Sequence, residues 1–144
     1  MKGKWKMGKV AVVYWSGSGN TEEMANAVAQ GAGDGAQLIR VSDFGADQVT
    51  EYDAIAFGCP AMGDEVLEES EFEPVFEACK PALKGKKIGL FGSYGWGDGQ
   101  WMRNWEEDCQ AAGAVLAAGS VICQDAPDDE ANASLQALGS ALAN

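Results

Sequence analysis

The stretch VAVVYWSGSGNT, Val10 to Thr21, joins a short apolar run to a loop of small and polar residues. The apolar part, residues 10–15, is continuously hydrophobic rather than alternating, which is typical of a strand buried on both faces of a parallel sheet. The amphipathic pattern that follows predicts a helix over residues 21–31. A buried strand that leads through a tight loop into a helix indicates an α/β fold.

The loop WSGSGNT, Trp15 to Thr21, is a candidate anion site. Gly17 and Gly19 leave the backbone accessible, and the hydroxyl and amide side chains supply hydrogen-bond donors. The free N–H groups and positive dipole end of the following helix point to the same place, which suits a phosphate. A plain strand-to-helix turn with Asn20 or Thr21 as N-cap explains the same residues, so this loop alone leaves both interpretations open.

Better-known phosphate-binding sequences do not match this loop. The pattern GxxxxGK[ST] lacks its lysine here, and GxGxxG lacks its third glycine. A phospho-accepting receiver domain needs carboxylates at the end of the first strand, and Tyr14, Trp15 and Ser16 offer none. Nucleotide hydrolysis, ordinary dinucleotide binding and phosphotransfer are therefore disfavoured.

The rest of the chain continues the alternation of apolar runs with amphipathic stretches. Further strands are predicted over 36–41, 52–59, 86–92 and 114–123, helices over 70–83, 100–112 and 128–142, and a short crossover over 42–51. One domain over 9–144 is expected, with a parallel sheet covered by helices on both faces. Ligands of such sheets bind beyond the carboxyl ends of the strands.

Composition and charge exclude several functions. The formal net charge of −12 over 144 residues disfavours nucleic acid and anionic membranes as partners and favours basic proteins. The chain has no histidine, which excludes Ser-His-Asp and Cys-His hydrolysis and His-ligated zinc. Its four cysteines form no CxxC pair, so no metal site is predicted and buried free thiols are expected. Without an apolar run of about 20 residues or a signal sequence, we expect a cytoplasmic protein.

Two further loops follow strands at the ligand-binding edge. Seven carboxylates fall within residues 64–77, which a solvated helix face and a favourable helix N-terminus explain only in part. Just before them, Ala61-Met62-Gly63 places a flexible apolar side chain at the edge. The loop SYGWGDGQW, Ser93 to Trp101, places Trp96 between glycines, where it serves as a platform for a planar ring or as a core residue. Together the three loops describe a phosphorylated, planar, partly apolar ligand.

Three segments of this sequence resemble flavodoxins of the short-chain, clostridial type, and the likeness runs from about Lys9 to the C-terminus. They are VYWSGSGNTEEMA (Val13 to Ala25), FGCPAMGDEVLEESEFEPVFE (Phe57 to Glu77) and FGSYGWGDGQWMRNWEE (Phe91 to Glu107). The resemblance implies a three-layer sandwich with a five-stranded parallel sheet of order 2-1-3-4-5 and non-covalently bound FMN. It also implies a monomeric low-potential electron carrier that shuttles between quinone, semiquinone and hydroquinone states and serves soluble redox enzymes.

The same resemblance implies roles for individual residues. Trp96 would cover the outer face of the isoalloxazine ring and Met62 the inner face, while Glu65 would accept from the ring N3–H. The Gly63-Asp64 peptide would sit beside N5 and turn over on reduction, which glycine makes inexpensive. The phosphate would be enclosed by Ser16, Gly17, Ser18, Gly19, Asn20, Thr21 and Ser93. The remaining residues expected at the cofactor are Ala61, Tyr94, Gly95, Gly97 and Asp125.

Three features depart from the family pattern. Pro60 stands where related proteins often carry a serine near the phosphate, and Asp125 stands where an asparagine is common. A basic segment, residues 1–8, precedes the usual start and is expected to be a disordered tail, with a docking arm as the alternative.

Two other functions remain open alongside the electron carrier. A small FMN-dependent quinone or disulfide reductase would share the fold, and a flavin-free binding module would keep only the fold. With Trp96 on one face of the ring and Met62 on the other, little ring surface is left for a substrate. We therefore expect an electron-transfer protein rather than an enzyme.

Overall fold

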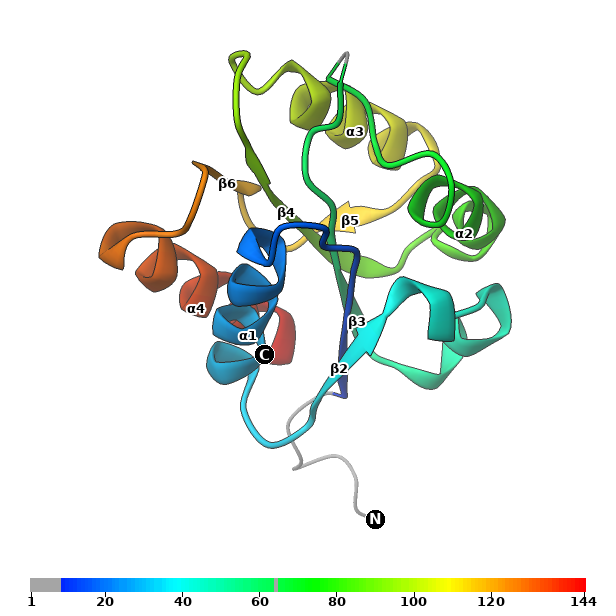
Figure 1. Ribbon diagram of the computed structural model, residues 1–144. Helices are drawn as coiled ribbons and strands as arrows, with labels where there is room; N and C mark the ends of the chain where they lie inside the picture. Colours follow the sequence, from blue (N-terminus) through cyan, green and yellow to red (C-terminus); the bar gives the residue numbers. More distant parts are fainter. Residues whose placement is uncertain (1–8, 64) are drawn as a thin grey trace.

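The computed structural model describes residues 9–63 and 65–144, so the predicted tail, residues 1–8, and Asp64 lie outside the described residues. The chain alternates strands with helices (Figure 1). The elements are β1 (Val10–Tyr14), α1 (Asn20–Ala32), β2 (Ala36–Arg40), β3 (Ala54–Gly58), α2 (Phe72–Cys79), β4 (Lys87–Tyr94), α3 (Gln100–Ala111), β5 (Val115–Leu116), β6 (Val121–Gln124) and α4 (Asp129–Ala143). Two 3-10 turns, Val41–Asp43 and Ala46–Glu51, form the expected crossover.

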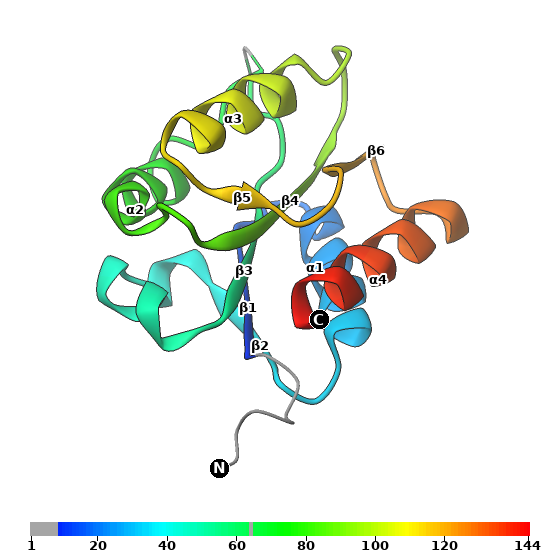
Figure 2. The ribbon, with the colours of Figure 1, turned by 180° about the vertical axis from the view of Figure 1, so that it is seen from behind.

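The strands of the sheet pair in parallel in the order β2-β1-β3-β4-β5, which confirms the predicted topology. At its centre Val12 of β1 lies between Leu38 of β2 and Ala56 of β3. The prediction of one continuous strand over 114–123 is wrong. This segment is split into β5, which pairs with the start of β4, and β6, which pairs with its end (Figure 2). The break falls at residues 117–120, Ala-Ala-Gly-Ser, because small residues have little preference for extended structure.

Helices cover both faces of the sheet, which explains the continuous apolar runs. Along β1, Val10, Val12 and Tyr14 pack with α1 and α4 on one face. Ala11 and Val13 pack with the side chains of α2 and α3 on the other. The two helix pairs are visible on opposite sides of the sheet (Figure 1). The fold is thus the three-layer sandwich that the sequence predicts.

The helices α1 and α4 touch backbone to backbone through two glycines. A Cβ atom at Gly31 would lie 1.9 Å from the carbonyl oxygen of Gln136, and one at Gly139 would lie 2.0 Å from the carbonyl oxygen of Val28. Side chains at either position would hold the helices apart. These glycines therefore set the thickness of this layer.

The helix predicted over 70–83 is shorter than expected at both ends. It begins at Phe72, because the carboxylate of Glu68 accepts hydrogen bonds from the N–H groups of the three residues that precede and open the helix. It ends at Cys79, and a 3-10 turn, Lys80–Ala82, follows. Pro81 cannot donate a backbone hydrogen bond, which accounts for the change of helix type.

Candidate functional site

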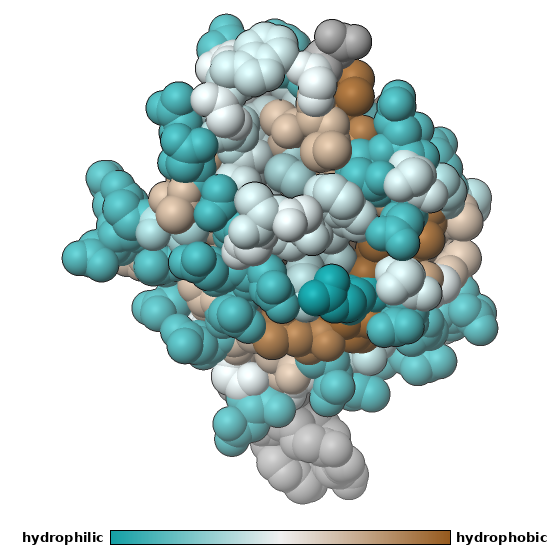
Figure 3. Space-filling view, viewed as in Figure 1, coloured by the Kyte–Doolittle hydropathy of each residue, from teal (hydrophilic) through white to brown (hydrophobic). Residues whose placement is uncertain are grey.

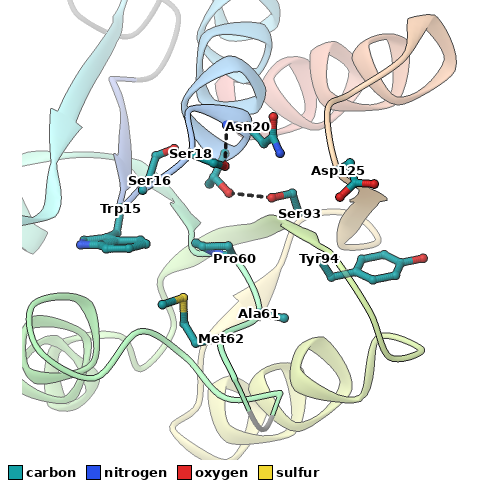
Figure 4. Close-up of a pocket in the computed structure, with 13 residues that line it drawn as sticks. Trp15, Ser16, Ser18, Asn20, Pro60, Ala61, Met62, Ser93, Tyr94 and Asp125 are labelled. Carbon is teal, nitrogen blue, oxygen red and sulfur yellow. Dashed lines mark hydrogen bonds between the residues drawn. The ribbon is translucent and has the colours of Figure 1, made fainter.

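A cavity of about 350 Å³ opens at the carboxyl ends of β1, β3 and β4, the edge where the sequence predicts a ligand. The same face carries a pale band of residues of intermediate hydropathy between hydrophilic flanks (Figure 3). Figure 4 shows the lining side chains converging from these loops and from the end of β6. The lining residues are Trp15, Ser16, Gly17, Ser18, Asn20, Thr21, Pro60, Ala61, Met62, Ser93, Tyr94, Gly95 and Asp125.

The loop after β1 is held by the hydroxyl of Ser16. Its Oγ accepts hydrogen bonds from the N–H groups of Gly19 at 3.0 Å and Glu22 at 3.3 Å. Gly19 is the N-cap residue and has a left-handed backbone with φ +100°, a conformation that favours glycine. The alternative that Asn20 or Thr21 serves as the N-cap of a plain turn is therefore wrong, because α1 already begins at Asn20.

This loop presents unused hydrogen-bond donors to the cavity. Within the described residues, the backbone N–H groups of Ser16, Gly17, Ser18 and Thr21 have no acceptor. They lie at the positive end of the α1 dipole. This set of donors suits an anion, and a phosphate group best.

A buried pair of hydroxyls links this loop to the end of β4. The Thr21 Oγ1 and Ser93 Oγ atoms lie 3.3 Å apart, and both side chains are almost fully buried (Figure 4). Each hydroxyl keeps hydrogen-bonding capacity beyond this contact. Of the described residues, the cavity lining contains no lysine or arginine. An anion at this end would therefore be held by dipoles alone.

The other end of the cavity is apolar. Pro60, Ala61 and Met62 form one wall after β3, and Tyr94, whose ring points away from them, lines the cavity at the end of β4 (Figure 4). Met62 is fixed in a tight turn, since its N–H donates to the carbonyl of Val66 at 2.9 Å and its carbonyl accepts from Val66 at 3.2 Å. An end rich in free hydrogen-bond donors and an apolar end in one cavity match a planar phosphorylated ligand such as FMN.

Some residues predicted at the cofactor lie beside the cavity rather than in its lining. The residue Trp96 is 63% exposed. Gly19 and Gly63 belong to the loops after β1 and β3 but do not line the cavity. The carboxylate of Glu65 packs against Gly97, where a Cβ atom would lie 2.6 Å from its carboxyl carbon. The same carboxylate accepts from the N–H of Gln100 at 3.1 Å, so it connects the turn after β3 to the start of α3.

Asp125 brings a negative charge to the cavity. It follows β6, and its N–H donates to the carbonyl of Tyr94 at 2.9 Å. Its φ of 59° places it in the left-handed region. The neighbouring Gln124 donates its Nε2 to the carbonyl of Gly95 at 3.2 Å, which ties β6 to the loop that carries Trp96.

Comparisons with known proteins agree with this geometry. The family model for Flavodoxin matches residues 12–137 of this chain. The chain is 48% identical to the flavodoxin of Clostridium beijerinckii over 136 residues, which are 92% of this chain and 98% of that protein. It is 49% identical to the flavodoxin of Megasphaera elsdenii over 123 residues, 83% of this chain and 89% of that one.

This chain belongs to the flavodoxin family.

A solved structure supports the assignment. The solution structure of two-electron reduced Megasphaera elsdenii flavodoxin superposes with a TM-score of 0.85 at 46% identity, covering 93% of this chain and 98% of that one. The recognition from the three sequence segments is thus confirmed. The protein is an FMN-binding electron carrier rather than an enzyme, and the reductase alternative is not supported.

The flavodoxin cavity has two lining residues whose contribution sequence reasoning missed. Trp15 was expected only as the first residue of the loop, yet its indole forms a side wall. Pro60, noted only as a departure, lines the cavity together with Ala61 and Met62 after β3. An aromatic side chain directly after a buried strand was the one available signal for Trp15.

The thiols of this flavodoxin are poorly suited to redox chemistry. All four cysteines are free, and burial raises the pKa of the Cys59 and Cys109 thiols to about 12. A protonated thiol is a poor nucleophile. In the described parts of the chain, no helix is long and apolar enough to cross a membrane, and no group of three or more metal-ligating side chains gathers.

Proposed function

We propose that this flavodoxin holds the FMN phosphate on residues 16–21 and Ser93, and the isoalloxazine ring between Met62 and Trp96. One observation carries this assignment. Four unpartnered backbone N–H groups and the buried Thr21–Ser93 hydroxyl pair meet apolar walls within a single cavity. Its volume of about 350 Å³ lies within the range of about 300–1,000 Å³ that is usual for ligand pockets.

Trp96 is the proposed outer cover of the ring site. Its neighbours are Gly95, which lines the cavity, and Gly97, whose φ is +93°. Flanking glycines give the backbone freedom to adjust, and the exposed indole has a large apolar face available for stacking. Tyr94 and Ala61 complete the walls around the ring, and Glu65 remains the proposed acceptor for the ring N3–H.

FMN supplies the ability to accept and release electrons one at a time. The chain's part is to bind the flavin, exclude water from its faces and present hydrogen-bond partners at its edge. Gly63 is exposed, and no described atom lies within 4 Å of the position that its Cβ would take. Glycine opposes a change of backbone conformation less than other residues do, and the Gly63 carbonyl is the proposed acceptor for a proton at N5.

The charge of the chain supports two finer proposals. The net charge of −12 and the carboxylate of Asp125 in the cavity lining disfavour further negative charge on a bound flavin, so the second electron is accepted at low potential. The same field attracts redox proteins with basic surfaces as electron donors and acceptors.

Binding to the apo-protein tests the assignment. Adding FMN is expected to quench the flavin fluorescence in a one-to-one complex, with riboflavin binding more weakly because it lacks the phosphate. Ser93→Ala removes one member of the buried hydroxyl pair and is expected to weaken FMN binding more than riboflavin binding. Equal affinity of the wild-type protein for the two flavins would contradict the phosphate assignment.

A further inference from the structure

A long-range hydrogen bond holds the indole of Trp15 at the side of the cavity. Its Nε1 donates to Oε1 of Glu71 at 2.8 Å, although the two residues are 56 positions apart in the sequence. Trp15 directly follows β1 as the first residue of its loop, and Glu71 stands just before α2, among the carboxylates of residues 64–77. The bond therefore joins the loop after β1 to the loop after β3.

Glu71 is itself held by a buried carboxylate. Its N–H donates to Oε1 of Glu68 at 2.8 Å, and the N–H groups of Ser70 and Phe72 donate to the same carboxylate at 2.9 and 2.8 Å. Glu68 is only 5% exposed. The acceptor for the Trp15 indole thus stands on a fixed piece of backbone.

At its other end the Trp15 indole rests on the loop after β1. A Cβ atom at Gly17 would lie 3.0 Å from Cη2 and 3.3 Å from Cζ3 of the indole. Gly17 lines the cavity, and its N–H is one of the groups without an acceptor. The position of the indole therefore restricts the backbone that presents this donor.

We propose that Glu71 is a positioning residue that makes the site selective for phosphorylated flavin over riboflavin. By fixing Trp15 over Gly17, it keeps the free N–H groups aimed into the cavity before the ligand arrives. A preorganised set of donors binds more tightly, because less conformational entropy is lost on binding. This inference rests on the proposed placement of the FMN phosphate.

A purely electrostatic role for Glu71 predicts the opposite result. Its carboxylate repels a phosphate dianion, so loss of the charge alone would strengthen FMN binding and leave riboflavin binding unchanged. Loss of the positioning bond weakens FMN binding instead. The two explanations therefore differ in the sign of the effect.

The test compares FMN and riboflavin dissociation constants, measured by flavin fluorescence quenching of the apo-protein, for the wild type and for E71A, E71Q and E69A. E71A is expected to weaken FMN binding by about five- to tenfold, as loss of one hydrogen bond does, with riboflavin affinity within about twofold. E71Q keeps an acceptor oxygen and is expected to stay near the wild type. E69A removes the same charge from an exposed neighbour and controls for electrostatics.

A second variant, W15F, tests whether the effect of Glu71 on FMN binding acts through Trp15. W15F removes the indole donor, so adding E71A to W15F is expected to leave the FMN-to-riboflavin affinity ratio unchanged. An E71A ratio equal to or above that of the wild type overturns the inference, as does equal weakening of both flavins, which would indicate general destabilisation. Failure of the wild type itself to bind FMN would instead overturn the proposed function.

Discussion

At the scale of single residues, Asp125 and Glu68 show opposite uses of a carboxylate. Asp125 lines the cavity, and its left-handed backbone is held by the N–H donated to Tyr94. Glu68 is buried away from the cavity lining and accepts several N–H groups. The first charge is proposed to act on a bound flavin, and the second holds the backbone of an adjacent segment.

Asp125→Asn is expected to tighten FMN binding by about two- to fivefold and to raise the midpoint potential of the second one-electron step, because a negative charge next to the cavity is lost. Asparagine tolerates the left-handed backbone at least as well as aspartate, so the loop is preserved. Fluorescence quenching measures the affinity and a redox titration the potential. Glu107→Gln, at an exposed position on α3, is the control. An unchanged potential in D125N would refute this role.

Glu68→Gln is expected to lower the free energy of unfolding of the apo-protein at pH 7 by about 1–3 kcal/mol. Burial raises the pKa of Glu68, but the hydrogen bonds from Ser70, Phe72 and Glu71 outweigh it and leave the folded-state pKa below its usual value. A lowered pKa means that the ionised group stabilises the fold above the unfolded-state pKa, and that this contribution is lost as the pH falls through the folded-state pKa. Urea unfolding should therefore show the wild-type advantage shrinking below about pH 4. A wild-type advantage that stays constant as the pH is lowered well below about 4 would be inconsistent with this role.

At the scale of elements, the contact between α1 and α4 depends on Gly31 and Gly139. Gly139→Ala is expected to lower the free energy of unfolding by about 1–3 kcal/mol, although alanine ordinarily favours a helix, because its Cβ would lie 2.0 Å from the Val28 carbonyl oxygen. Urea unfolding of the apo-protein measures the change. Ser134→Ala, at an exposed position of the same helix, serves as the matched control. A stability gain in G139A would show that the helices separate at no cost.

The elements were predictable from sequence where the pattern was local. Consecutive apolar residues predicted β1, β3 and β4. Local sequence also predicted the helix starts near Asn20 and Gln100. The split between β5 and β6 was missed, because both pieces pair with β4 and the run looked continuous. The hydrogen bond from Trp15 to Glu71 could not be predicted, because it depends on how two loops far apart in sequence pack.

The candidate site shows the same division. The residues that were predicted and do line one cavity are Ser16, Gly17, Ser18, Asn20 and Thr21 after β1, together with Ala61, Met62, Ser93 and Tyr94. The orientation of Glu65 toward Gln100 was not predictable, since it depends on the approach of the turn after β3 to the start of α3. The places of Trp96 and of the Gly63-Asp64 peptide at the flavin remain predictions.

At the scale of the whole molecule, the charge of −12 predicts how electrons leave the protein. With basic cytochrome c as a probe acceptor, the rate of electron transfer from the reduced protein is expected to fall as salt is raised from about 0.01 M to 0.15 M, as the Debye length shortens from about 30 Å to 8 Å. Stopped-flow absorbance measures this rate. A rate that is insensitive to salt would contradict electrostatic steering.

The central claim is that this cavity holds FMN and lets it take up two electrons separately, the second against the negative charge of the protein. An anaerobic reductive titration of the purified protein, followed by absorbance and potential, tests it most directly. The account predicts a yellow protein in which long-wavelength absorbance rises to a maximum near half-reduction and then falls, with the second step at the lower potential. A colourless protein that stays colourless with added FMN, or one that bleaches in a single two-electron step, would contradict it.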